Sequence, residues 1–398
     1  MIIPPLGNGF AWRKCRPAEE EEVAFLSRLI LVVSVGSLFF GLKIFSVAAD
    51  EKESPAQDSL MRRQRAEFAG FYLKDPAAAK VPQASIAVEF YNQAVEFYRQ
   101  REYELARQAL TDSLTYDPKN SFAYELLGNI HDVKGELSQA LEEYKKAYQL
   151  QPRKELRDRI EKLMHETTIE EEFVTFEDQH FVLKYQGEIR PDYLARIRKA
   201  LKAAYEELVK DLGYYFKQPV IVLLYDQQEF REITRLPHWV RGFYDGKIRI
   251  PAHTYGMLDL DLEAQLAHEM THAVVSGISE GQAPAWLQEG LAVYEENKVK
   301  KSELIVFNAA VKTNRLLSLD QLISEKEAAS GKDSLLAGLF YEQSFQWVDY
   351  LVRHFGMAQI KQMLVEFSKG KDSDEVLRTH LKKPLQELER EWKTSLIN

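Results

Sequence analysis

Cysteine is almost absent from this chain, because Cys15 is the only one among 398 residues. No intrachain disulfide can form, and a zinc site built on cysteine thiolates is excluded. An excess of basic charge is also lacking, since 61 acidic side chains outnumber 52 basic ones and give a net charge of −9. A generic nucleic-acid-binding protein would show a basic surface, so we expect no nucleic-acid partner.

A hydrophobic run long enough to cross a membrane comfortably is missing near the N-terminus. The apolar run Leu29–Leu42 has 14 residues, whereas a membrane-spanning helix needs about 20. Its length is that of the apolar part of a signal peptide, and Ser46–Ala48 and Val47–Ala49 both resemble a cleavage site. We therefore expect residues 1–49 to be a signal peptide or membrane anchor, with residues 23–49 as the tether. The protein would then be exported, either periplasmic or anchored to the membrane facing the periplasm.

A helical repeat follows a polar stretch, residues 50–84, which we interpret as a linker. Two similar segments end in proline at Pro118 and Pro152, an offset of 34 residues. This period is that of the tetratricopeptide repeat, whose paired helices stack into a continuous core. Because two repeats rarely bury enough core alone, we expect a helix around Leu156–Leu163 to cap them. The predicted repeat module is residues 85–165, with a protein as its partner.

Residues 172–398 have a different pattern. FVTFEDQHFVLKYQG alternates apolar and polar residues, which predicts a hairpin. The next segment has helical spacing up to Gly213, PVIVLLYD predicts a buried strand, and GFYDGKIRIP predicts a strand near an edge that ends at Pro251. The remainder is helical. A sheet followed by helices indicates an α+β domain, here preceded by all-α hairpins.

The stretch LAHEMTHAVV contains two histidines four residues apart, with a glutamate directly after the first. Residues i and i+4 of a helix differ by about 40° around its axis, so His268 and His272 would present their imidazoles on one face. Two imidazoles on one helical turn can hold a zinc ion. Glu269 lies about 100° from His268, where it can take a proton from a water on the metal.

A catalytic zinc commonly has three protein ligands and one open position. Ile278 stands where the metzincin spacing needs a histidine, so that class is excluded, and the later histidines, His354 and His380, are far along the chain. The nearer option is Glu289, in a helix that starts near Pro284. A helix–turn–helix could bring its carboxylate to the metal.

Glu295 and Glu296 are alternatives to Glu289, either as ligands or as carboxylates that orient a histidine. Glu296 shares a helical face with Glu289, whereas Glu295 is roughly opposite. The orienting role therefore fits Glu296 alone.

The motif HEMTH at 268–272, followed by EGLA at 289–292, resembles the gluzincin metallopeptidases, whose third ligand is the glutamate of a Glu-x-x-Ala motif. Flanking segments such as PAWLQEGLAVY resemble bacterial exported peptidase-like proteins of this superfamily that carry tetratricopeptide repeats. The resemblance covers residues 173–356 and implies a zincin-like catalytic domain. It implies that His268, His272 and Glu289 hold the zinc and that Glu269 is the catalytic base.

The resemblance implies two further features. Gluzincins often stabilise the anionic intermediate with a tyrosine or histidine from the later helices, and Tyr341 is the candidate, unless it belongs to an aromatic core stripe. In this superfamily an edge strand beside the motif helix binds the substrate backbone, and DGKIRIP would be that strand. Lys247 and Arg249 would then point to solvent or to substrate. His253 would line the cleft or lie on a surface loop.

These observations predict a zinc metallopeptidase of gluzincin type that cleaves protein or peptide substrates in the cell envelope. The alternative is an envelope scaffold without catalysis, in which the repeats dock a partner and the metal site is retained. A structural zinc usually has four protein ligands, and no fourth is evident here.

Overall fold

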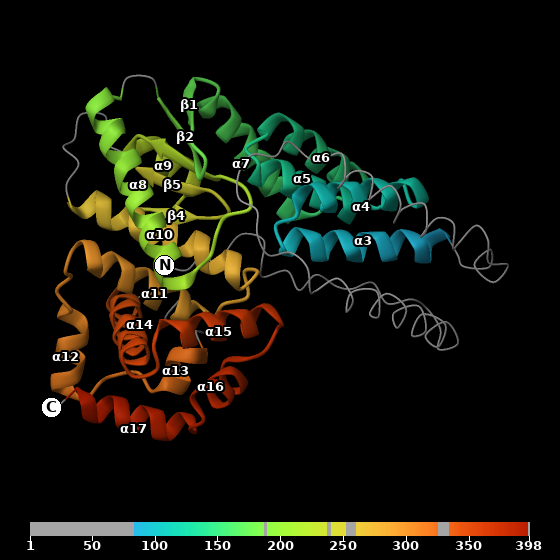
Figure 1. Cartoon of the computed structure of the whole chain (residues 1–398). Coiled ribbons are helices and arrows are strands. Elements are labelled where there is room, and N and C mark those ends of the chain that lie inside the picture. Colours follow the sequence, from blue (N-terminus) through green and yellow to red (C-terminus); the bar gives the residue numbers. More distant parts are fainter. Residues whose placement is uncertain (1–82, 187–188, 237–239, 252–259, 325–333, 397–398) are drawn as a thin grey trace, which may run out of the picture.

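The computed structural model describes residues 83–186, 189–236, 240–251, 260–324 and 334–396 (Figure 1). The predicted signal or anchor (residues 1–49), almost all of the linker (50–84) and His253 lie outside these ranges. Within the described ranges, no helix is both long enough and apolar enough to cross a membrane.

The described chain begins with two helical hairpins and a fifth helix. They are α3 (Gln83–Arg99), α4 (Tyr103–Tyr116), α5 (Ser121–Val133), α6 (Leu137–Leu150) and α7 (Lys154–Glu170). The helical repeat predicted from the 34-residue offset is therefore present, and a helix follows it where a cap was expected. Gly128 lets α5 and α6 approach closely, since a Cβ there would lie 2.5 Å from the ring of Tyr144. The specific assignment to tetratricopeptide repeats stays a prediction.

A mixed five-stranded sheet follows in the order β1-β2-β3-β5-β4. The strands are β1 (Phe173–Glu177), β2 (Phe181–Gln186), β3 (Val220–Tyr225), β4 (Phe243–Tyr244) and β5 (Ile248–Pro251). The pairs β1/β2 and β4/β5 are antiparallel, whereas β2/β3 and β3/β5 are parallel. The predicted first hairpin is confirmed, and every residue of β3 is buried, as its apolar run predicts.

Helices cover both faces of the sheet. Alternate residues of β3, such as Val222 and Leu224, pack with α8 (Pro191–Leu212) and α10 (Leu260–Ile278) in the main core. Leu223 and its neighbours face the other way, toward α9 (Gln227–Thr234) and the end of α7. The α8 helix ends at Gly213, whose φ of +56° is left-handed and favours glycine there.

The remaining chain is helical and shares the main core. Its helices are α11 (Ala285–Val299), α12 (Ile305–Thr313), α13 (Leu319–Ser324), α14 (Ser334–Phe355), α15 (Met357–Ser368), α16 (Ser373–Leu381) and α17 (Leu385–Ser395). Figure 1 shows α3–α7 to one side of the sheet and α11–α17 below it. The predicted α+β fold, with all-α hairpins before a small mixed sheet and C-terminal helices, is confirmed.

The predicted edge strand is wrong in detail. Strand β5, which holds most of DGKIRIP, pairs with β3 on one side and β4 on the other, so β4 is the edge of the described sheet. Lys247 and Arg249 are 2% and 1% exposed and point neither to solvent nor to a substrate. They bind carboxylates of the repeat helices, Asp132 on α5 and Glu166 on α7, at 2.5 and 3.2 Å.

Candidate metal centre

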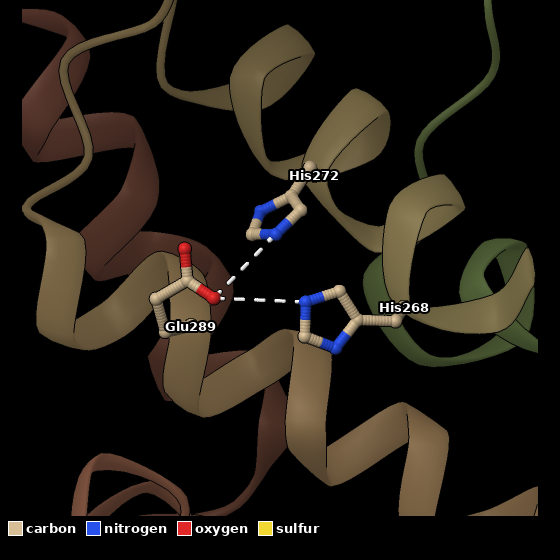
Figure 2. A group of neighbouring side chains, drawn as sticks. All are labelled: His268, His272 and Glu289. Atoms are coloured by element: carbon tan, nitrogen blue, oxygen red, sulfur yellow. Dashed lines mark ion pairs between the residues drawn. The ribbon is translucent and has the colours of Figure 1, made fainter. Parts of the chain in front are cut away.

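The two histidines of the motif lie on one face of α10 and point toward α11 (Figure 2). The α10 helix ends at Ile278, and a short turn leads to Pro284, the residue directly before α11. This helix–turn–helix brings Glu289 opposite both imidazoles, as its spacing from the motif predicted. A single carboxylate oxygen, Oε2 of Glu289, lies 3.6 Å from Nε2 of His268 and 3.6 Å from Nε2 of His272.

This trio has the separations that one shared cation requires. Its three ligand atoms all lie within 4.8 Å of one another. Ligand atoms about 2.1 Å from a tetrahedral metal lie roughly 3.4 Å apart, close to the observed nitrogen–oxygen distances. Two imidazoles and one carboxylate also form a donor set typical of a catalytic metal site. The residues present therefore fit a metal ion.

Glu296 holds the ring of His268 from its other side. Its Oε2 lies 3.0 Å from Nδ1 of His268, which leaves Nε2 directed toward Glu289. A carboxylate in this position fixes the tautomer and the ring orientation of a ligating histidine. Glu295 is buried on another side of α11, where it pairs with Lys298 at 3.0 Å. Helical spacing, which favoured Glu296 over Glu295 for this role, thus agrees with the observed contacts.

The charges within the trio shift the ionisation of both histidines and of Glu289. Burial disfavours the charged form of His268, but hydrogen bonds to Glu289 and Glu296 more than offset it and raise its pKa to about 10. Burial lowers the pKa of His272 to about 4. Burial raises the pKa of Glu289, but the two imidazoles pull it below its ordinary value overall. A proton and a metal ion therefore compete for the same nitrogen of His268.

Glu269 is almost fully buried, at 3% exposure, beside the trio. Its Oε1 accepts a hydrogen bond from Nε2 of Gln265, one helical turn earlier, at 2.5 Å. Gly242, just before β4, packs directly against this carboxylate, because a Cβ there would lie 2.4 Å from Oε1. Burial, more than any neighbouring charge, raises the pKa of Glu269 to about 7. At that pKa the carboxylate can both take up and release a proton near neutral pH.

The metal trio and Glu269 open onto a cleft of about 340 Å³. The edge strand β4 lines this cleft on one side, and Tyr341 of α14 lines it as well. Burial, together with the carboxylates of Glu289 and Glu269, raises the pKa of Tyr341, so its hydroxyl stays protonated. Tyr341 thus lies in the cleft, although its ring also packs edge-on against Phe340. The five side chains given a catalytic or metal-binding role from the sequence all line this cleft, namely His268, His272, Glu269, Glu289 and Tyr341.

Three residues of the site were not predicted from the sequence. Gln265 could have been found, because it precedes Glu269 by four residues on the same helix. Gly290 lets α14 approach the helix that carries Glu289, since a Cβ there would lie 2.6 Å from the backbone oxygen of Ser344. Neither Gly242 nor Gly290 has a local sequence signal, because each is required by a contact from a distant segment.

The fold and the His-His-Glu trio define a metallopeptidase type of hydrolase. The family model of the Peptidase MA superfamily matches residues 200–398, half of the chain. The chain therefore belongs to the Peptidase MA superfamily, whose members are typically metal-dependent. A search of curated proteins found no match to the chain.

Proposed function

We propose that this protein is a zinc-dependent peptidase of gluzincin type, with His268, His272 and Glu289 as zinc ligands. The observation that carries the proposal is the equal distance, 3.6 Å, from one oxygen of Glu289 to Nε2 of each histidine. When bound, zinc would polarise the scissile carbonyl and lower the pKa of water. The other roles belong to side chains of this chain.

Glu269 acts as the general base and then as the general acid. It takes a proton from the attacking water and transfers it to the nitrogen of the leaving amine. The pKa of about 7 supports this double role, and a bound cation would lower that pKa by favouring the ionised carboxylate. The hydrogen bond from Gln265 fixes the carboxylate, and the absence of a side chain at Gly242 gives it room.

Tyr341 stabilises the oxygen that becomes negative as water attacks the carbonyl. Its raised pKa keeps a proton on the hydroxyl, so it can donate a hydrogen bond to that oxygen. The edge strand β4 binds the substrate backbone by β-addition, because it is the outermost strand at one edge of the described sheet and lines the cleft. The substrates are proteins or peptides of the cell envelope, where residues 1–49 would direct the chain.

Exchange of Glu269 for glutamine tests the mechanism. Glu269→Gln keeps the size and the contact with Gln265 but removes the basic oxygen, so peptide cleavage should fall by at least about a thousandfold. Zinc content should stay near one ion per chain, measured by atomic emission after dialysis. Glu263→Gln, on the same helix but outside the cleft, is the matched control and should keep full activity.

A digest of unfolded envelope proteins, with and without a chelator, provides the readout. Chelator-sensitive fragments from the wild type and none from Glu269→Gln would support the mechanism. Equal cleavage by both proteins would remove Glu269 from it. Bound zinc without any fragments would instead favour a scaffold that retains the metal site.

A further inference from the structure

A second cavity, of about 360 Å³, lies between the repeat helices and the sheet. We call it the repeat cavity. The side chains that line it come from α3, α5 and α7, from the end of α9, from β4, and from the turn between β4 and β5. Its apolar walls are Tyr98, Val133, Leu163, Ile233 and Phe243.

The repeat cavity and the metal cleft meet at one residue of the edge strand. Phe243 lines both of them. Gly242, its neighbour in the chain, packs against the carboxylate of Glu269. Consecutive Cα atoms are about 3.8 Å apart, so the repeat cavity begins one residue along β4 from the glycine that contacts the proposed base. A chain that lies along β4 in the cleft therefore reaches the repeat cavity within a few residues.

The chemistry of the repeat cavity favours an apolar side chain. Three of its acidic residues are already neutralised by ion pairs, since Asp132 binds Lys247, Glu166 binds Arg249 and Asp245 binds Lys162. Exposed polar residues, Glu155, Asp158 and Arg235, also line the cavity, beside its apolar walls. A cavity with apolar walls and polar residues beside them is typical of a pocket for an apolar side chain of a bound peptide.

Contacts between the two parts of the chain fix the repeat helices against the sheet beside the repeat cavity. Arg101, in the turn between α3 and α4, donates to the hydroxyl of Tyr244 on β4 at 2.9 Å. It also donates to the carbonyl oxygen of Ala273, which follows the second histidine of the motif, at 3.3 Å. These bonds tie the repeats directly to the edge strand and to the motif helix. A site that is formed before binding loses less entropy when its ligand arrives.

We propose that the repeats form a subsite of the active site itself. An extended segment of the substrate lies along β4, and a large apolar side chain near the scissile bond occupies the repeat cavity. This inference rests on the proposed peptidase function, because it assigns a substrate-binding role to a surface beside the cleft. Its ligand is an unfolded polypeptide with apolar side chains, not a separate regulatory protein.

A matched pair of substitutions on α7 tests the subsite. Asp158 and Glu161 are both exposed, at 51% and 61%, and both lie near Arg157. Only Asp158 lines the repeat cavity. Asp158→Trp would place an indole over the entrance, whereas Glu161→Trp adds the same side chain elsewhere on the helix. Neither site is buried, so both variants should fold.

Binding is measured separately from cleavage, in full-length protein carrying Glu269→Gln. The probe is fluorescein-labelled β-casein, an unfolded protein, and the readout is fluorescence anisotropy. Adding Asp158→Trp should weaken binding by about tenfold or more, the effect of losing one good contact. Adding Glu161→Trp should change it by less than about twofold, as for most surface substitutions.

The outcomes separate this inference from the proposed function. Equal binding by the two tryptophan variants, or no binding of β-casein to the Glu269→Gln protein, would overturn the subsite. Tighter binding after Asp158→Trp would also overturn it and indicate that another segment normally fills the cavity. Absence of chelator-sensitive cleavage by the wild type would instead contradict the peptidase proposal. The anisotropy measurement would then still decide whether the repeat cavity binds an unfolded polypeptide.

Discussion

Glu296 illustrates how one residue can orient a candidate metal ligand without belonging to the trio itself. It lies on α11, whereas His268 lies on α10. Its 3.0 Å contact with Nδ1 of His268 leaves Nε2 directed toward Glu289. Arg241 lies 3.7 Å from the other oxygen of Glu296. Loss of this carboxylate would free the imidazole to rotate and to change tautomer.

We therefore predict that Glu296→Gln weakens metal binding by about 10- to 100-fold, the usual cost of removing such a contact. The affinity is measured by competition with a chelator of known strength. Glu295→Gln is the neighbouring control, because Glu295 is buried but contacts Lys298 and not His268. A similar loss of affinity in both variants would show that the contact between Glu296 and His268 has no special role.

At the scale of elements, the position of Glu289 depends on how closely α14 packs against α11. Gly290 lies at this contact, where a Cβ would come within 2.5 Å of Val348 and 2.6 Å of the backbone oxygen of Ser344. A backbone atom cannot move aside as the end of a flexible side chain can. The two helices would have to separate, and Tyr341 on α14 would move with them.

Gly290→Ala should therefore destabilise the protein by about 1–3 kcal/mol, the usual cost of overpacking a core, despite the better helix propensity of alanine. The free energy of unfolding is measured in urea. Gly338→Ala is the control on α14, because the nearest atom to its Cβ would be a side-chain carbon of Val306 at 3.3 Å. Equal stability of the two variants would contradict the tight contact between α11 and α14.

Elements whose signal is local could be predicted from the sequence. The i, i+4 spacing places His268 and His272 on one face of α10, and a buried run predicts β3. The position of Glu289 near the two histidines could also be predicted, because only a short turn separates α10 from α11. The edge position of β4 was missed, because a two-residue strand carries no periodicity and its place depends on which strands pair across the sheet.

The ion pairs of Lys247 and Arg249 were missed for a related reason. Alternation along DGKIRIP indicates a strand but not what covers each of its faces. The covering groups come from α5 and α7, far away in the sequence, so only the assembled molecule shows that these cations are buried. Buried lysine and arginine are rare unless they are paired, and residues 245–251 alone contain too few acids to pair them.

At the scale of the whole molecule, this buried charge cluster joins the repeats to the sheet. Asp245 accepts bonds from Arg249 on β5 and from Lys162 on α7, at 3.1 and 3.2 Å. Burial disfavours its charged form, but Arg249, Lys162 and Lys247 more than offset this and hold the pKa of Asp245 well below its ordinary value. Burial also disfavours the charged form of Asp132, but the nearby cations, above all Lys247, more than offset this and lower the pKa of Asp132.

A depressed carboxylate pKa makes the stability of this arrangement depend on pH. Below the ordinary aspartate pKa of about 3.9, the unfolded chain binds a proton at Asp245 and the folded chain does not. The contribution of Asp245 is therefore fully present above about pH 5 and is lost progressively as the pH falls toward the folded pKa. Acid should thus weaken the attachment of the repeats to the sheet.

Asp245→Asn isolates this effect. At pH 7 the variant should lose about 3 kcal/mol of unfolding free energy, because Arg249 and Lys162 lose a buried partner. Between pH 5 and 3, the unfolding free energy of the wild type should fall more steeply than that of the variant. The difference is up to about 1.4 kcal/mol per pH unit for one proton. Urea titrations at pH 7, 5 and 3 measure both quantities. Asp374→Asn, at an exposed pair with Arg378, is the control. Parallel pH profiles for the wild type and Asp245→Asn would show that this carboxylate does not link the two parts through its charge.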